Sequence, residues 1–160
     1  MGIDPGSLVT GYGIIKTEGN RIKLLDAGPI RLKKLGEIQA RLHHLHDFLE
    51  ERIKAFSPQV MSIEKIFHGV NFKSVLLLGY VRGVALMLAG RHGLEVAEYA
   101  PTQVKKTVTG YGGADKVQVS EMVRILLSLR EPPKPHDVAD ALALAICHMN
   151  HTPVQHNYGR

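Results

Sequence analysis

Four acidic residues stand at the ends of apolar segments, where a carboxylate is costly unless a positive partner compensates it. Asp4 lies near the start of the chain, Glu64 ends the apolar run from Val60, and Asp137 and Asp140 open the last apolar segment. Magnesium prefers hard oxygen ligands, commonly carboxylates, waters and phosphate oxygens. The four acids therefore predict a magnesium site that acts on a substrate containing phosphate.

Each of these acids also has an ordinary structural interpretation. Asp4 could form the turn made by the proline and glycine that follow it, and Glu64 could end a strand and point to solvent. Asp137 could simply lie in the first turn of a helix, where the helix dipole favours an acid. Asp140 fits such an explanation less well, because apolar residues surround it and it shares a helix face with Asp137. We therefore favour one acidic site.

The remainder of the chain is basic. The 160 residues include 20 Lys and Arg against 15 Asp and Glu, and the net charge is +5. Setting the four acids aside leaves 11 acids against those 20 bases. A basic surface favours nucleic acid, because cations that neutralise phosphates release condensed counterions. Ordinary solvated lysines are the alternative.

The length predicts a single domain over residues 1–151, followed by a polar tail, 152–160, that we expect to be disordered. Cys147 is the only cysteine, so no internal disulfide can form, and its predicted role is packing. No apolar run approaches the roughly 20 residues that span a bilayer, and no secretory signal is recognisable. We expect a cytoplasmic protein with no membrane partner.

The order of the predicted elements indicates an α/β fold with a mixed sheet, in which early hairpins are antiparallel and later helix-linked strands parallel. Three strands come first, and helices and strands then alternate. The predicted strands after the first are 10–17, 21–31, 60–63 and 94–99, and the predicted helices are 36–56, 72–88, 101–108, 116–129 and 136–148.

Several other residues are candidates for binding. Lys105, Lys106 and Lys116 flank a glycine-rich stretch, Gly110–Gly113, which we predict to be a flexible break; they could follow a phosphate backbone or be solvated. Phe67 could stack on a base or belong to the core.

The histidines have a separate set of interpretations. His136 could ligate a metal or be a bystander beside Asp137. His43, His44 and His46 are predicted to lie on the surface, because neighbouring positions of a helix point in different directions.

Taken in order, these segments resemble the RuvC family of bacterial Holliday-junction resolvases over roughly residues 1–150. The resemblance rests on the ordered set and its spacing, since each motif alone is weak. Its motifs are Gly2-Ile3-Asp4-Pro5-Gly6-Ser7, Thr10-Gly11-Tyr12-Gly13, Ile63-Glu64 with Phe67, Leu78-Gly79, Arg82-Gly83-Val84-Ala85, Gln103-Val104-Lys105, Thr107-Val108, Gly110, and Asp137 with Ala139-Asp140-Ala141-Leu142-Ala143.

The resemblance implies an RNase H-like fold with a mixed five-stranded sheet flanked by helices. It also implies a homodimer that resolves four-way DNA junctions by paired nicks, in recombination and repair. Two Mg²⁺ ions, for which Mn²⁺ could substitute, would be held by the four acids, which become the catalytic residues. The resemblance implies that Lys105 and Lys116 contact the DNA backbone and that Phe67 stacks on a base at the junction centre. A branch-migration motor of the RuvA and RuvB type is the implied partner. The family usually has a few more residues before the first acid, so we expect either a short first strand or one whose start is trimmed.

Three other readings stay open. An ATPase of the actin and sugar-kinase class has a similar phosphate loop, but it needs two such domains and this chain has room for one. A related RNase H-like nuclease could act on another nucleic acid, such as RNA. A junction-binding protein without catalysis could keep the fold, although it would gain nothing from four acids beside phosphates.

Overall fold

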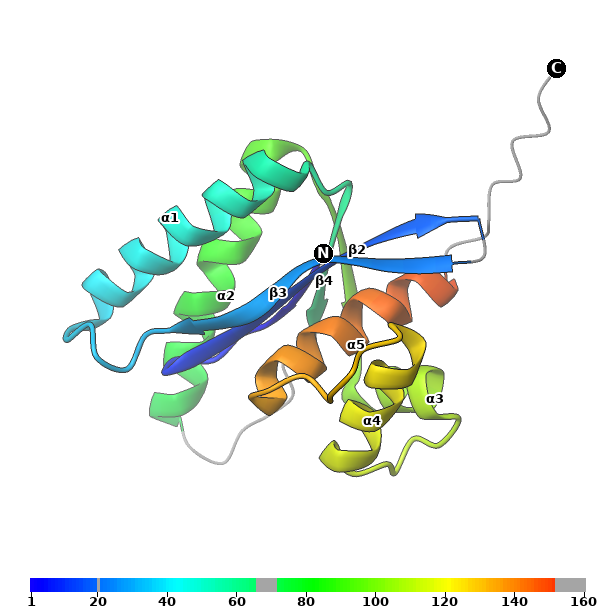
Figure 1. Ribbon diagram of the computed structural model, residues 1–160. Coiled ribbons are helices and arrows are strands. Elements are labelled where there is room, and N and C mark those ends of the chain that lie inside the picture. The colour runs from blue at the N-terminus through cyan, green and yellow to red at the C-terminus, as the bar shows by residue number, and fades with distance from the viewer. Residues whose placement is uncertain (20, 66–71, 152–160) are drawn as a thin grey trace, which may run out of the picture.

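A five-stranded sheet lies between two layers of helices in the computed structural model, which describes residues 1–19, 21–65 and 72–151 (Figure 1). Helices α1 and α2 cover one face of the sheet, and α5 covers the other, with α3 and α4 packed against α5. The strands are β1 (Gly2–Asp4), β2 (Val9–Glu18), β3 (Arg21–Arg31), β4 (Val60–Glu64) and β5 (Glu95–Tyr99); the helices are α1 (Ile38–Phe56), α2 (Phe72–His92), α3 (Pro101–Thr109), α4 (Lys116–Leu126) and α5 (His136–His151).

The strand order is β3-β2-β1-β4-β5. Strand β1 pairs antiparallel with β2, and β2 with β3, whereas β1–β4 and β4–β5 are parallel. This is the predicted mixed sheet: short turns join the antiparallel strands, and helices make the longer crossovers between parallel ones. The first strand has only three residues, as expected.

The two faces of the sheet alternate along each strand, as the pleat requires. Ile3, Met61 and Ile63 point to the α1–α2 side, where they are fully buried with Leu45 and Leu49 of α1. The residues between them point to the α5 side. This alternation decides where every side chain at the strand ends will lie.

Glycines let α5 lie almost on the backbone of the sheet. A Cβ added at Gly2 would come 1.9 Å from the carbonyl oxygen of Ala141, and one at Gly11 would come 1.9 Å from that of Asp137. At Gly13 an added Cβ would meet the side chain of Leu142 at 2.5 Å. Any other residue at these positions would force helix and sheet apart.

Each helix has one boundary that differs from its sequence-based prediction; α2 and α3 end at His92 and Thr109 rather than at residues 88 and 108. Helix α1 begins at Ile38 rather than residue 36, because Gly36 has φ of 75° and cannot be part of the helix. Helix α4 ends at Leu126 rather than residue 129, since Ser128 turns the chain with φ of 53°. Helix α5 continues three residues beyond the predicted end, to His151.

The Gly110–Gly113 segment, predicted to be a flexible break, has a defined hydrogen-bonded turn. Gly110 ends α3 with φ of 80°, and its N–H donates to the Lys106 carbonyl. The Thr109 hydroxyl accepts from the Tyr111 N–H at 3.2 Å. Helix α4 then begins with a capping box between Asp115 and Gln118. The turn therefore fixes α3 relative to α4.

Helix α2 is unusual because it keeps many apolar side chains in solvent. Of the helices in the described segments, it alone is long and apolar enough by length and composition to span a bilayer. Val81, Ala85 and Leu88 are nevertheless buried in the core, which is the arrangement of a helix packed on a globular domain.

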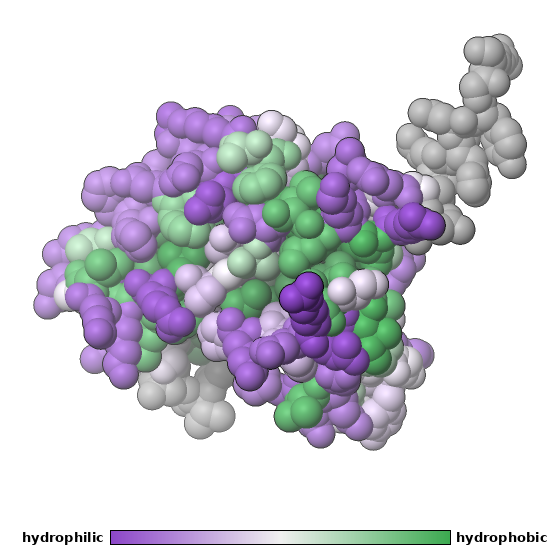
Figure 2. Space-filling model, viewed as in Figure 1, coloured by the Kyte–Doolittle hydropathy of each residue, from purple (hydrophilic) through white to green (hydrophobic). Residues whose placement is uncertain are grey.

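Figure 2 shows hydrophilic residues around the outer edge of the molecule and a hydrophobic band across its middle.

The close approach of α5 can be tested by adding one methyl group. Gly11→Ala places that carbon against the Asp137 carbonyl, so we expect a loss of about 1–3 kcal/mol in the free energy of unfolding. Gly90→Ala in α2 is the control: nothing lies within 4 Å of the added carbon, and alanine favours helix by about 0.5–1 kcal/mol. Urea denaturation measures both variants. Equal stability of the two would contradict the packing described.

Candidate active site

Asp4 and Glu64 are brought side by side by two parallel strands. Ile3 of β1 pairs with Ile63 of β4, so the next residue of each strand is one of these acids. Both follow a residue whose side chain faces α1 and α2, and both therefore point to the opposite face, toward α5. The carboxyl ends of two adjacent parallel strands thus present two acids to the same helix.

The start of α5 adds the other two acids to this place. Asp4 pairs with Gly11 of β2, and the Asp137 backbone carbonyl lies directly against Gly11. Asp140 follows three residues later, on the same face of the helix. Both acids of α5 are partly buried. The glycine contact therefore sets the distance between the acids of the helix and those of the sheet.

The four carboxyl groups interact electrostatically. Burial is the largest of the causes that raise the pKa of Asp4 to about 8; the charges of Asp140, Glu64 and Asp137 add to it, and Lys116 opposes it. The pKa of Glu64 is raised by burial and then by Asp140. Burial also raises the pKa of Asp140, which Lys116 opposes. Without cations, the site holds more negative charge than its surroundings stabilise.

Two of the three predicted DNA-binding lysines lie beside these acids. Lys116 places its Nζ 3.6 Å from Oδ2 of Asp140, although its side chain is 68% exposed. Lys105 of α3 is near enough to oppose the rise in the pKa of Glu64. Lys106 is exposed on α3, and no ion pair joins it to these acids in the described part of the chain. The α3–α4 turn thus positions two cations at the edge of the site.

The donor chemistry of the site fits Mg²⁺, since four carboxylates supply hard oxygen ligands and have no other sufficient counter-charge. They do not form a preformed cage: no three His, Cys, Asp or Glu side chains within the described residues are close enough to enclose a metal ion. His136 is exposed at the first position of α5 and opposes, as the smallest of the causes, the rise in the pKa of Asp140. Its role as a ligand stays a prediction.

Two other predictions fall on residues outside the described segments: the stacking role of Phe67 and the disorder of the tail, 152–160. The remaining histidines agree with the surface interpretation. His43 and His44 are exposed and His46 is partly so, with His43 and His46 both contacting the Asp47 carboxylate. Cys147 is buried and free, as expected for a packing residue.

Sequence reasoning did not identify Arg82 as a residue of the site. This arginine of α2 is only 9% exposed. Its Nη1 donates to the backbone carbonyl of Glu64 at 2.7 Å, and its Nη2 lies 2.7 Å from Oε1 of Glu98 on β5. A single arginine inside an otherwise apolar helical stretch was the available signal. Arg82 holds the end of β4, and with it the backbone from which the Glu64 carboxylate projects.

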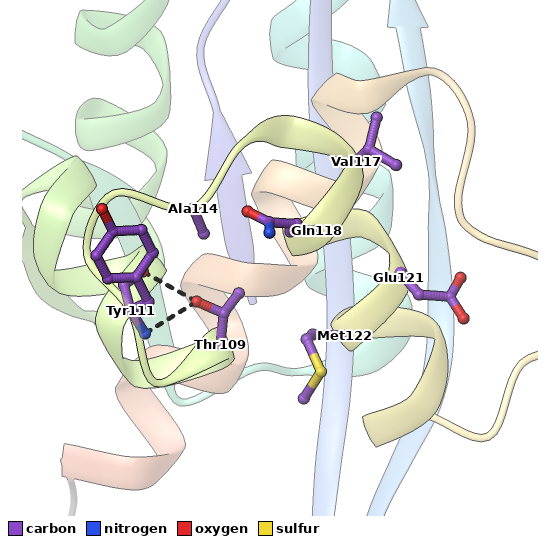
Figure 3. A pocket seen from close by; sticks show the side chains of 7 residues that line it. All are labelled: Thr109, Tyr111, Ala114, Val117, Gln118, Glu121 and Met122. Atoms are coloured by element: carbon purple, nitrogen blue, oxygen red, sulfur yellow. Dashed lines mark hydrogen bonds between the residues drawn. The ribbon is translucent and has the colours of Figure 1, made fainter.

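One hollow near these elements is separate from the acids. A cavity of about 420 Å³ lies between the α3–α4 turn and α4, next to the helix that carries Lys116 (Figure 3). Tyr111 and Thr109 border one side, and Gln118 and Met122 project from α4 on the other. None of the four acids lines this cavity.

The raised pKa of Asp4 predicts how stability depends on pH without metal. Between its ordinary pKa of 3.8 and about 8, folded Asp4 keeps a proton that the unfolded chain releases. Stability should therefore fall as pH rises through this window. Asp4→Asn removes the effect, so at pH 8 in chelator we expect it to melt several °C above the natural protein. Thermal unfolding measured from pH 4 to 9 tests this prediction. If the melting temperatures of both proteins changed with pH in parallel, the raised pKa would not belong to Asp4.

The Arg82 contact predicts an effect on metal binding in addition to stability. Arg82→Met leaves the Glu64 carbonyl without its buried partner, which costs about 1–3 kcal/mol. Glu98→Gln, the control, weakens only the partly exposed ion pair. We expect added Mg²⁺ to raise the melting temperature of the natural protein and Glu98→Gln, but much less that of Arg82→Met. An equal rise in all three would show that Arg82 is merely structural.

Comparisons with known proteins identify the family. The profile of the family "Crossover junction endodeoxyribonuclease RuvC" matches residues 1–148. The RuvC protein of Ruminiclostridium cellulolyticum is 48% identical over 150 residues, 94% of this chain and 90% of the relative. That of Alkaliphilus oremlandii is 49% identical over 148 residues, covering 92% and 90%.

A solved structure shows that the similarity extends to the fold. The structure of Thermus thermophilus RuvC in complex with Holliday junction substrate superposes with a TM-score of 0.87 at 32% identity, covering 92% of this chain and 90% of the other. The predicted RNase H-like fold is therefore confirmed. With the family profile, the relatives and the fold in agreement, the chain belongs to the RuvC family of crossover junction endodeoxyribonucleases.

Proposed function

We propose that this protein is a crossover junction endodeoxyribonuclease that resolves four-way DNA junctions by paired, metal-dependent nicks. The observation that carries the proposal is the convergence of Asp4, Glu64, Asp137 and Asp140 from two strands and a helix, beside two lysines, in a RuvC-family chain. The reaction is hydrolysis of a phosphodiester bond by water, and no side chain forms a covalent intermediate.

The four acids are the proposed ligands of two Mg²⁺ ions, for which Mn²⁺ could substitute. When bound, such ions lower the pKa of the attacking water and stabilise the leaving oxygen. Asp4 is the proposed central ligand of the site, since all three other acids affect its pKa. The ligands can only serve when deprotonated, so metal binding should release the proton that Asp4 holds near neutral pH.

The lysines are proposed to bind the DNA backbone. Lys116 and Lys105 can contact phosphates next to the scissile bond, because both already lie within electrostatic reach of the acids. Lys106, exposed one position further along α3, is a candidate for a more distant phosphate. Phe67 keeps its proposed role in stacking on an unpaired base at the crossover.

Three observations favour this function over the alternatives. A pure junction binder would be weakened by negative charge at the place where phosphates must approach, and all four acids are present. An RNase H-like nuclease for another nucleic acid would share the acids, but the chain matches the crossover junction family over nearly its whole length. The two-domain architecture of a kinase-like ATPase is absent from the described segments, which form one sheet.

We further propose that the protein acts as a homodimer through α2. Phe72 is 81% exposed, Leu76 42%, Tyr80 43% and Met87 51%, and the open positions of Gly79 and Gly83 would let another backbone approach. A two-fold dimer would place one site on each of two strands of a junction with near two-fold symmetry. Sedimentation across a dilution series tests this; a monomer that still makes paired nicks would refute it.

The cellular context is proposed on family grounds alone. A RuvA- and RuvB-type branch-migration motor is the expected partner, and the cytoplasm the expected location. Joint assembly of purified RuvA- and RuvB-type proteins with this chain on a junction, detected by gel mobility, is the direct test; independent binding of each would count against a joint complex.

Cleavage of an end-labelled four-way junction tests the central proposal. With Mg²⁺ or Mn²⁺ the natural protein should make symmetric nicks in the junction and none in a matched duplex, and chelator should abolish them. Asp4→Asn should lower the cleavage rate more than about a hundredfold, because even residues that only support metal ligands cost 10–100-fold. Its affinity for the junction should persist. Glu18→Gln, an exposed acid at the far end of β2, is the control. Retained metal-dependent cutting by Asp4→Asn would refute the assignment.

A further inference from the structure

A group of cations on the opposite side of the acids from Lys105 and Lys116 has no assigned role. Arg31 is the last residue of β3, and Lys33 and Lys34 follow it; all three are exposed. Within the described part of the chain none of them forms an ion pair, and residues 31–41 contain four bases and a single acid, Glu37. We call Arg31, Lys33 and Lys34 the basic ledge.

The sheet register places the ledge at the same end of the molecule as the active site. Asp4 pairs with Gly11, and Val9, two residues earlier on β2, pairs with Arg31. Residues two apart share a face, so Arg31 belongs to the face that carries Asp4. From Asp4 to Arg31 the path crosses two strand spacings of about 4.8 Å and runs two residues of about 3.4 Å along the strand. The backbone of Arg31 therefore lies about 12 Å from that of Asp4. The rise of a DNA strand covers this distance in roughly three to four nucleotides.

Hydrogen bonds attach the ledge to the loop that follows Asp4. The N–H groups of Leu32 and Lys33 both donate to the Leu8 carbonyl, at 2.9 and 3.0 Å. Arg41 of α1 donates to the Gly36 carbonyl at 2.8 Å and reaches the Ser7 carbonyl at 3.5 Å. Leu32 itself is fully buried. The cations therefore project from a backbone fixed relative to the catalytic strand, which is what a binding surface requires.

We infer that the basic ledge binds the phosphate backbone of the duplex arm that leaves the active site on the β3 side. Strand order puts β3 at one edge of the sheet and β5, which leads into α3, at the other. Lys105 and Lys116 thus guide the substrate on one side of the acids and the ledge on the other. The ledge positions the arm through charge, and this binding does not depend on the DNA sequence, because backbone phosphates carry no sequence information. This inference rests on the proposed junction-cutting function.

A matched control exists at the other end of the same hairpin. Lys16, Arg21 and Lys23 are also exposed, and they lie at the β2–β3 turn, where Lys16 pairs with Lys23, far from Asp4 (Figure 1). Replacing either set of three bases by glutamine changes the net charge equally and leaves every backbone hydrogen bond of the ledge available. A difference between the variants therefore reports position and not charge.

The experiment measures junction binding as a function of salt, in Ca²⁺ or chelator so that no cutting occurs. The ledge triple, Arg31→Gln, Lys33→Gln and Lys34→Gln, should weaken binding at least about tenfold at 0.15 M salt. It should also lower the slope of log K against log salt by roughly two to three, at about 0.9 for each lost phosphate contact. The hairpin-tip triple should change affinity less than about twofold and leave the slope unchanged. Equal losses in both triples would overturn the inference.

Two further measurements separate this inference from folding and from the proposed function. Melting temperatures of both triples should lie within a few °C of the natural protein, and the single variant Lys34→Gln should lower the slope by about one if a triple is destabilised. Hydroxyl-radical footprinting should lose protection on one pair of arms only; unchanged protection overturns the ledge. If the natural protein binds junctions but never cuts them, the nuclease proposal fails while the binding data still decide the ledge.

Discussion

The close contact between α5 and the sheet is the constraint on which the rest of this structure depends. Gly2, Gly11 and Gly13 leave no side chain between the helix and β1–β2, so the helix backbone lies against the strand backbone. The same contact that closes this side of the core also carries Asp137 and Asp140 to the end of β1. Fold stability and the geometry of the site are thus determined by the same few residues.

The second constraint is electrostatic. Four carboxyl groups share a partly buried place in which burial and mutual repulsion oppose ionisation, and Lys116 gives only partial relief. Such an arrangement has little value for stability, because each charge is costly without a partner. It has value for chemistry, because cations that enter the site find ligands with no better partner. The substrate then brings further negative charge, which the surrounding basic surface is suited to accept.

Contacts from several elements around the acids support this arrangement. Arg82 reaches from α2 to the Glu64 carbonyl, so the helix whose exposed face is proposed to form the dimer also fixes the end of the strand that carries Glu64. The hydrogen-bonded turn between α3 and α4 positions Lys105 and Lys116, and the Leu8 and Arg41 contacts position the basic ledge. Each side of the acids therefore has its cations on a backbone that is tied to a strand or helix of the domain.

The sequence by itself determined the acids, the order of strands and helices, and the family resemblance, because apolar periodicity and motif spacing are local properties that survive without coordinates. It also predicted the parallel and antiparallel parts of the sheet. Only the tertiary structure decided the partners of Arg82, the turn at Gly110–Gly113, the ends of α1 and α4, and the location of Arg31 on the face of Asp4. These depend on pairing register and on contacts between residues distant in the chain, for which the local sequence carries no signal. The glycines of β1 and β2 show this difference. The sequence contains them, but only the structure shows why they are needed: a helix more than a hundred residues later in the chain packs directly against them.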